Sequence, residues 1–178
     1  WNAWYFFGLY ANAADHEARW STESTHDMDR YILAKARDFV TEVQAAQDDF
    51  HIAAACDAVR SFVDVLTNWY IRGSRDRFWS DDTRAFDTLY TVLEVTCRLA
   101  APLLPLTTEK IWRALTGQRS VHLTDWPVLD EAFADDALVA AMDRVRDVVS
   151  TTLSLRKAGE LRVRQPLRTL RVVTDDAE

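Results

Sequence analysis

The chain has 178 residues, a formal net charge of −7 and a hydrophobic fraction of 48%, values that predict one globular domain, with room for a small appendage. They exclude wholesale disorder and argue against a general affinity for polyanions. No apolar run approaches the roughly 18 residues of a membrane span, so no membrane association is expected.

The reactive side chains form no recognisable catalytic group. Cys56 and Cys97 fall in expected amphipathic helices, where buried reduced thiols are typical of a cytoplasmic protein. The histidines lie far apart and have no metal-ligand spacing with each other or with cysteine. No glycine-rich phosphate loop occurs, and no nucleophile stands with a base and an acid. We therefore expect no catalytic residue, no cofactor and no metal within this chain.

The apolar spacing predicts a series of helices joined by short loops, and hence a mainly α fold, an antiparallel helical bundle. The first helix is dense in aromatic residues, and the polar stretch 20–25 should supply the N-cap of the second. Gly73 should weaken or kink the last turn of the third, at a cost of about 1 kcal/mol relative to alanine. The expected ranges are about 1–19, 27–46, 50–77, 86–100, 107–115 and 135–157.

The pattern changes near the C-terminal end. Residues 120–127, SVHLTDWP, should be extended and close on a turn. After Gly159, Leu161 and Val163 alternate with arginines, which predicts a strand that Pro166 ends or confines to an edge, and a second short strand should follow over 170–174. We therefore expect a helical domain over 1–158 and a small mixed α/β appendage over 159–178 that is truncated.

The first candidate binding segment is NWYIRGSRDRFW, residues 68–79. On a helix Arg72, Arg75 and Trp79 share one face, whereas Arg77 points elsewhere. Guanidinium groups pair with phosphates and aromatic rings stack on unstacked bases, so the segment predicts contact with RNA. The candidate contacts are Arg72, Arg75, Arg77 and Trp79. A structural interpretation is also open, in which Arg75 pairs with Trp79 through a cation–π contact and Arg72 pairs with Asp76.

The second candidate binding segment is residues 154–173. Residues 155–174 carry six basic groups against one acidic group, Glu160, although the chain as a whole is acidic. Such a local excess of positive charge suits one directed phosphate contact. The alternative is a solvated edge strand that its charges protect from aggregation. The candidate phosphate contacts are Arg156, Lys157, Arg162 and Arg164.

Several blocks of the chain, in order, resemble the anticodon-binding domain of isoleucyl-tRNA synthetases, which are class I aminoacyl-tRNA synthetases. The resemblance covers nearly the whole chain, and SVHLTDWP with the NWY…RFW combination favours the isoleucyl over the valyl or leucyl enzymes. One departure is Gly73, where the family commonly has a second arginine. The blocks are WNAWYFFGLYANA, MDRYILAKAR, NWYIRGSRDRFW, LAAPLLPLTTEKIW, SVHLTDWP and LRKAGELRVRQPL.

This resemblance implies a module that binds the anticodon arm of isoleucine tRNA within a cytoplasmic, monomeric ligase. The parent enzyme would use ATP and magnesium to join isoleucine to its tRNA and would edit mischarged valine. The signatures of its catalytic and editing domains do not occur here, and the chain starts at Trp1 without an initiator methionine, which predicts an excised fragment. The aromatic N-terminal helix would then contact the catalytic domain of the same chain.

Two other interpretations stay open on the sequence alone. The bundle could be a structural or interaction module with no RNA affinity of its own, which its acidic composition favours. It could also be the equivalent domain of a valyl-tRNA synthetase. A free-standing enzyme has little support, because no catalytic site is visible.

Overall fold

A computed structural model describes residues 1–80, 82–129 and 134–173, and every regular element in them is helical. The chain divides into two compact units, the helical unit Trp1–Asp136 and the C-terminal unit Ala137–Glu178. No helix in the described ranges is both long and apolar enough to span a membrane. The elements are α1 (Asn2–Ala13), α2 (Asp27–Asp48), α3 (Ile52–Asp64), η1 (Val65–Ile71), η2 (Arg75–Trp79), α4 (Thr83–Ala100), α5 (Pro105–Thr116), η3 (Val121–Leu123) and α6 (Asp136–Ala158).

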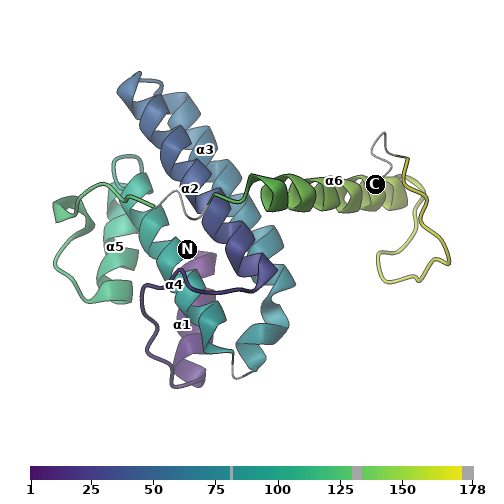
Figure 1. Ribbon diagram of the computed structural model, residues 1–178, viewed down its shortest axis with the longest axis horizontal. Coiled ribbons are helices and arrows are strands. Elements are labelled where there is room, and N and C mark those ends of the chain that lie inside the picture. Colours follow the sequence, from purple (N-terminus) through teal and green to yellow (C-terminus); the bar gives the residue numbers. More distant parts are fainter. Residues whose placement is uncertain (81, 130–133, 174–178) are drawn as a thin grey trace. The chain divides into compact units, whose positions relative to one another are not determined.

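Helix α4 is the centre of the helical unit. Thirteen of its 18 residues are buried, and it contacts α1, α2, α3 and α5. The helices α2 and α3 form an antiparallel hairpin at one side of α4 (Figure 1), and the stacked rings of Phe39 and Phe62, 4.4 Å between centroids, join them. Burial of such apolar faces is the main source of stability for helices of this length.

A second cluster of buried residues surrounds Trp112, between α4, α5 and η3. The guanidinium of Arg98 lies 5.2 Å from the centroid of the Trp112 ring and also pairs with Glu94 on its own helix. Burial raises the pKa of the neighbouring Cys97 thiol to about 12, so this cysteine is an inert core residue. The other cysteine, Cys56, is half-buried on α3.

The predicted helices from residue 27 to residue 116 are confirmed within a few residues at each end, while the first is shorter than expected and ends at Ala13. Residues 14–26 instead form a loop that is bound to α4. The hydroxyl of Thr91 accepts a hydrogen bond from the backbone amide of Ser21 at 2.8 Å and donates one to the carbonyl oxygen of Ser21 at 3.0 Å. The N-cap of α2 is His26, whose Nδ1 accepts from the amide of Met28 at 3.2 Å, rather than a serine or threonine.

The third predicted helix changes its winding before it ends. α3 continues into the π-helix η1, a helical stretch reaches Gly73, and a 3₁₀ helix, η2, follows. The predicted weak turn at Gly73 is therefore where this long helix ends. A β-carbon at this glycine would lie 3.0 Å from the terminal methyl carbon of Met28, so α2 packs closely against it.

Three helices end in Schellman motifs whose left-handed residue is not glycine. In each motif the next residue's amide donates to a carbonyl five positions back, for example His51 to Ala46 at 2.7 Å. The three left-handed residues are Asp15 (φ 50°), Phe50 (φ 57°) and Glu160 (φ 54°). Among the described residues, Gly117 after α5 is the one glycine with a left-handed backbone, at φ 69°. Sequence patterns that rely on glycine therefore miss most of these ends.

The C-terminal unit differs from its prediction. Residues 161–173 contain no strand, and the predicted strand residue Thr174 lies outside the described residues. A strand requires a neighbouring strand as hydrogen-bond partner, but here Nη2 of Arg156 donates to the carbonyl oxygens of Arg162, Val163 and Gln165. The segment belongs to the same compact unit as most of α6. The described part of the appendage is therefore a folded-back segment, not a mixed α/β element.

Residues 120–127 are only partly extended, as a short 3₁₀ helix interrupts the predicted extended piece. The backbones of Ser120 and Thr124 are extended, and η3 lies between them. The carboxylate of Glu109 accepts from the hydroxyl of Ser120 at 2.9 Å and from the amide of Val121 at 3.0 Å. These bonds attach the segment to α5.

Replacing Phe50 with glycine should raise the free energy of unfolding by up to about 1 kcal/mol, because a left-handed backbone costs an L-residue about 1–2 kcal/mol and glycine loses part of this gain to chain entropy. The Phe50 side chain is 86% exposed, so little packing is lost. Urea unfolding measures the change. The matched control is Gly117→Ala, which meets no atom within 4 Å and should be destabilising through backbone strain alone. A less stable Phe50→Gly variant would contradict this account.

Candidate nucleic-acid interface

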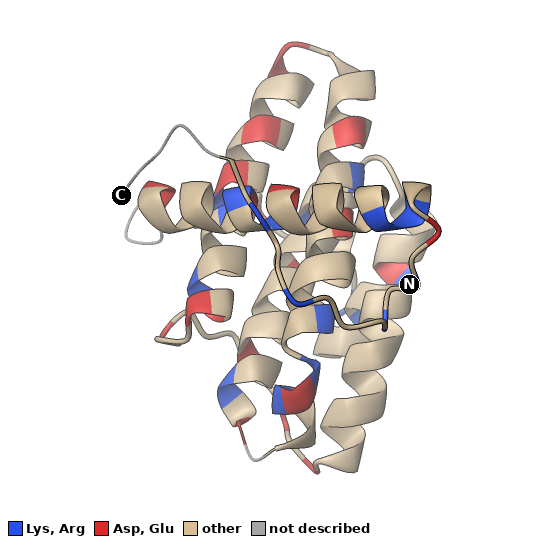
Figure 2. Ribbon diagram, turned by 90° about the vertical axis from the view of Figure 1, so that its right-hand side faces the viewer, with Lys and Arg blue, Asp and Glu red and all other residues tan. Residues whose placement is uncertain are grey.

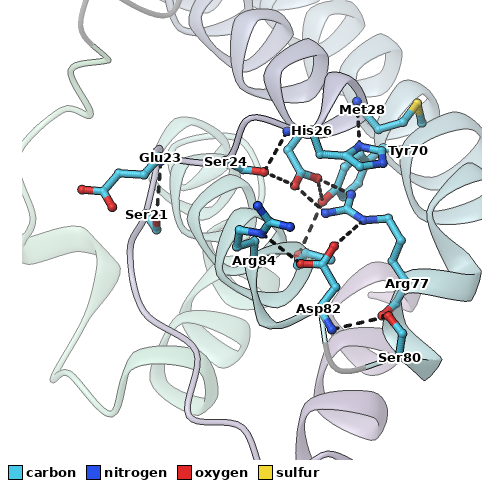
Figure 3. Close-up of polar contacts among 12 residues, drawn as sticks. Ser21, Glu23, Ser24, His26, Met28, Tyr70, Arg77, Ser80, Asp82 and Arg84 are labelled. Atoms are coloured by element: carbon cyan, nitrogen blue, oxygen red, sulfur yellow. Dashed lines mark hydrogen bonds and ion pairs between the residues drawn. The ribbon is translucent and has the colours of Figure 1, made fainter.

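The buried carboxylate of Asp29 organises the candidate RNA-binding segment. Its side chain is inaccessible to solvent and accepts from the Ser24 hydroxyl at 2.6 Å and the Tyr70 hydroxyl at 2.8 Å. Arg77 binds it with both terminal nitrogens, each at 2.7 Å. Figure 3 shows Arg77 reaching from its short helix toward Tyr70 on one side and Asp82 on the other. Groups from four separate stretches of the chain therefore meet at one carboxylate.

The local sequence explains why Asp29 can be buried as an ion. It lies in the first turn of α2, where the positive end of the helix dipole favours negative charge. The bidentate contact with Arg77 and the two hydroxyl donors supply four hydrogen bonds to its two oxygens. A buried ion pair is stable only with such full hydrogen bonding.

A second carboxylate, that of Asp82, completes the surroundings of Arg77. It accepts from Nε of Arg77 at 2.9 Å and from Nε of Arg84 at 3.2 Å. Burial tends to raise the pKa of Asp82, but hydrogen bonds and charge attraction from Arg77 and Arg84 outweigh it, and the pKa is lowered. Burial likewise tends to lower the pKa of Arg77, but its bonds to Asp29 and Asp82 raise it above the ordinary value.

Tyr70 stays a neutral donor within this network. Burial raises the pKa of its hydroxyl well above the ordinary value, and the charge of Asp29 raises that pKa further. The ring belongs to the π-helix η1 and is fully buried. Its burial and its hydrogen bond to Asp29 make Tyr70 a structural residue.

The four predicted contact residues of the segment divide into two groups. Arg72, Arg75 and Trp79 are exposed, and the exposed fraction of Trp79 is 70%. The side chain of Arg77 is only 14% exposed and is held by Asp29 and Asp82. The helical-face argument assumed a continuous α-helix, which the structure replaces with a change of winding after α3.

The structural interpretation of these exposed residues is not supported. Within residues 1–80, 82–129 and 134–173, no ion pair joins Arg72 to Asp76 and no cation–π contact joins Arg75 to Trp79. Trp79 instead meets Tyr10 of α1 in a T-shaped contact, 5.1 Å between ring centroids. The cationic groups of Arg72 and Arg75 are therefore available to an external anion.

The second set of predicted contact residues lies in the C-terminal unit, and its members also differ in their surroundings. Arg156 is engaged with backbone carbonyls of the segment that follows α6. Lys157, Arg162 and Arg164 are exposed and form no ion pair with any described residue. Figure 2 shows lysine and arginine interspersed with aspartate and glutamate in both units, so cations are available only locally.

Sequence reasoning missed Asp29, Tyr10 and the role of Arg77. An acidic residue in the first turn of a predicted helix was a weak signal for Asp29, but its arginine partner is 48 positions away and no pattern joins them. No group of three potential metal ligands (His, Cys, Asp or Glu) occurs among the described residues. The segment thus presents the exposed cations of Arg72 and Arg75 and the exposed indole ring of Trp79, which suits the binding of an anion or a flat ligand.

Comparison with protein families gives one match over most of the chain. Residues 29–173 match the family described as the anticodon-binding domain of tRNA ligase. Over 75% of its length the chain also resembles a solved chain titled as the ternary complex of Agrobacterium radiobacter K84 agnB2 LeuRS-tRNA-LeuAMS, with a TM-score of 0.54, 18% identity and 16% of that chain covered. At this identity the likeness concerns the fold alone.

Curated relatives named isoleucine–tRNA ligase are much more similar in sequence. The protein of Leifsonia xyli subsp. xyli is 60% identical over 99% of this chain and 16% of the relative. The protein of Nocardia farcinica is 58% identical over 100% of this chain and 17% of its own length. The protein of Mycobacterium tuberculosis strain H37Rv is 53% identical over 100% of this chain and 17% of its own length. The chain therefore spans about a sixth of the length of these relatives.

Replacing Asp29 with asparagine should lower the free energy of unfolding by about 3–5 kcal/mol, because Arg77 is left buried without its main counter-charge. Urea unfolding of the chain measures this loss. The comparison is Tyr70→Phe, which removes one hydrogen bond and should cost about 1 kcal/mol. Equal losses in the two variants would show that the ion pair is not the dominant interaction.

Asp82 should contribute to stability above about pH 4 and lose that contribution in acid. Its pKa is lower in the folded chain than in the unfolded chain, where aspartate has a pKa of about 3.9. The stabilisation is therefore complete above the unfolded value and disappears as the pH falls through the folded value. Unfolding free energies between pH 6 and pH 3 should fall less steeply for Asp82→Asn than for the wild type. Parallel curves would exclude this role.

Proposed function

Because the chain belongs to the anticodon-binding domain family of tRNA ligases, we propose that it binds the anticodon arm of isoleucine tRNA as a module of an isoleucine–tRNA ligase. The names and identities of its curated relatives favour isoleucine over valine as the amino acid of that ligase. The module holds the anticodon arm so that the acceptor end of the tRNA reaches the distant catalytic site.

One observation carries this proposal, namely the exposed and unpaired cations beside an exposed indole. Arg72 and Arg75 are free to bind phosphates, and Trp79 offers an aromatic face to a base. Arg77 positions the segment through Asp29 rather than touching the RNA. A solved synthetase that shares this fold was crystallised with tRNA, which supports the assignment of the partner.

The C-terminal unit supplies a second contact surface in this proposal. Lys157, Arg162 and Arg164 carry exposed charge that can meet the RNA backbone. Arg156 organises the segment that presents two of these cations, since it binds the carbonyl oxygens of Arg162 and Val163. Its contribution to RNA binding is therefore mainly structural.

The chemistry of the parent ligase lies outside this chain in our proposal. That enzyme joins isoleucine to its tRNA with ATP and magnesium, edits mischarged valine and acts in the cytoplasm. No group of three potential metal ligands occurs among the described residues, and we propose no metal site in them. The contribution of this chain is the docking of the tRNA.

The N-terminal helix is the proposed contact with the catalytic domain of the same polypeptide, which acts as a monomer. Trp1, Tyr5 and Leu9 stand four residues apart and are 59%, 62% and 53% exposed. Such spacing places them on one face of α1. An exposed apolar face of this kind is typical of an interface.

That same face favours a second candidate function, a structural bundle without RNA affinity of its own. The acidic composition of the chain agrees with this alternative. The two functions differ in the salt dependence of tRNA binding, because only direct phosphate contacts release counterions.

Neutralising Arg72 and Arg75 together, as Arg72→Gln with Arg75→Gln, should weaken binding of isoleucine tRNA and flatten its salt dependence. Each phosphate contact contributes about 0.7–0.9 to the slope of log affinity against log salt, so the slope should fall by about 1.4–1.8. The pair Arg162→Gln with Arg164→Gln should produce a similar reduction. Filter binding or fluorescence anisotropy over 50–300 mM salt, about the range in which counterion release is measured, provides the readout.

The matched control is Arg113→Gln with Arg119→Gln, which removes two exposed arginines of the α5 region that the proposal does not use. This control should leave the slope unchanged. If all three double variants flatten the slope equally, binding is nonspecific. An unchanged slope for the Arg72 and Arg75 pair would remove these residues from the interface.

A further inference from the structure

An open groove of about 740 Å³ lies beside Trp79, between the end of α1 and the start of α4. Its lining combines aromatic and aliphatic residues with polar ones. None of the α1 residues in it was a candidate from the sequence. The lining residues used below are Tyr10, Asp15, His16, Phe78 and Trp79.

The aromatic lining of the groove is held by packing against neighbouring rings. Phe78 is buried and makes T-shaped contacts with Phe6 and Phe86, each 5.1 Å between ring centroids. These ring contacts anchor η2 at the residue that precedes Trp79. The indole meets Tyr10 in a T-shaped contact and stays 70% exposed, so most of its surface is open to a ligand. A fixed, open aromatic ring is a stacking platform for a flat ligand.

The polar side of the groove presents one uncommitted carboxylate. Asp15 is held in the left-handed conformation by the Schellman motif of α1, and its side chain forms no hydrogen bond with any described residue. The neighbouring His16 is committed, since its Nε2 lies 2.9 Å from Oδ1 of Asp87 and its ring packs on Phe86. A ligand in the groove can therefore donate a hydrogen bond to the carboxylate of Asp15, whose backbone is held by the Schellman motif.

We propose that this groove binds one unstacked base of single-stranded RNA. Trp79 stacks on the base, and the carboxylate of Asp15 accepts from an N–H group on its edge. This inference rests on the proposed function, and it adds a base-binding pocket formed by α1 and η2 to the phosphate contacts already described.

The chemistry of the groove favours a base over an apolar side chain. An apolar occupant would bury the carboxylate of Asp15 without a hydrogen-bond donor, which is unfavourable, whereas the amino and imino groups of bases are donors. The position of Arg75 also favours a nucleotide, because its positive charge lies near the stacking ring. Arg75 and Trp79 begin and end the same five-residue 3₁₀ helix, about 8 Å apart along its axis. One strand can therefore place a phosphate at Arg75 and a base at Trp79.

The experiment combines protein variants with RNA that lacks single bases. Isoleucine tRNA, and versions of it with one abasic nucleotide at each position of the anticodon loop, are bound to the intact polypeptide that contains this chain. Trp79→Ala should weaken binding of unmodified tRNA by about 5- to 100-fold, and Trp79→Phe should weaken it much less. One abasic position should weaken the wild type by a similar factor and leave Trp79→Ala nearly unchanged.

Asp15→Gly removes the acceptor without straining the fold, because glycine adopts the left-handed conformation freely. At the position identified by the abasic series, a base methylated on its edge nitrogens should weaken wild-type binding at least fivefold. The same base should have little effect on Asp15→Gly. Equal losses in both proteins would remove Asp15 from the pocket.

The outcomes separate this inference from the proposed function. If tRNA binds with a salt slope that depends on Arg72 and Arg75, but Trp79→Ala has full affinity, the groove proposal is wrong and the proposed function stands. If Trp79→Ala and every abasic substitution weaken binding independently, the base lies elsewhere. If the intact polypeptide does not bind isoleucine tRNA, both proposals fail.

Discussion

The ion pair between Asp29 and Arg77 is the interaction on which the candidate interface depends. It joins the first turn of α2 to η2, and its hydroxyl partners Tyr70 and Ser24 add η1 and the preceding loop. A carboxylate with no exposed surface is costly to bury, and these donors together offset that cost. The four stretches must therefore fold together, and the short helix η2 has one position relative to α2. A buried network of this kind gives geometric definition more than net stability.

This constraint determines which side chains of the segment can face a ligand. Arg77 and Phe78 point inward, to Asp29 and to the aromatic cluster of Phe6 and Phe86. Trp79 is left exposed beside them. A platform that is fixed before the ligand arrives loses less conformational freedom on binding, which raises affinity without new contacts. The buried arginine thus serves the exposed groups by holding their backbone.

The sequence predicted most of the helices because their apolar positions repeat with helical spacing, and it located the weak point at Gly73. It could not predict the roles of the arginines, since Arg72, Arg75 and Arg77 are alike in sequence and only the distant Asp29 distinguishes them. The left-handed ends at Asp15 and Phe50 were missed because neither is glycine. The strand expected after Gly159 followed from alternation alone, but alternation provides no hydrogen-bond partner, and the described segment folds back on Arg156 instead.

The acidity of the chain is compatible with an RNA partner because electrostatic contacts are local. At physiological ionic strength charges are screened over about 8 Å, so acidic groups on remote helices hardly weaken a phosphate bound at Arg72 or Arg75. The excess of negative charge still repels nucleic acid that approaches in other orientations. A few unpaired arginines on an acidic body therefore favour one docking geometry over many. Under the proposed function this property would help to orient a long RNA toward a distant site, because affinity spread over the surface would permit unproductive binding.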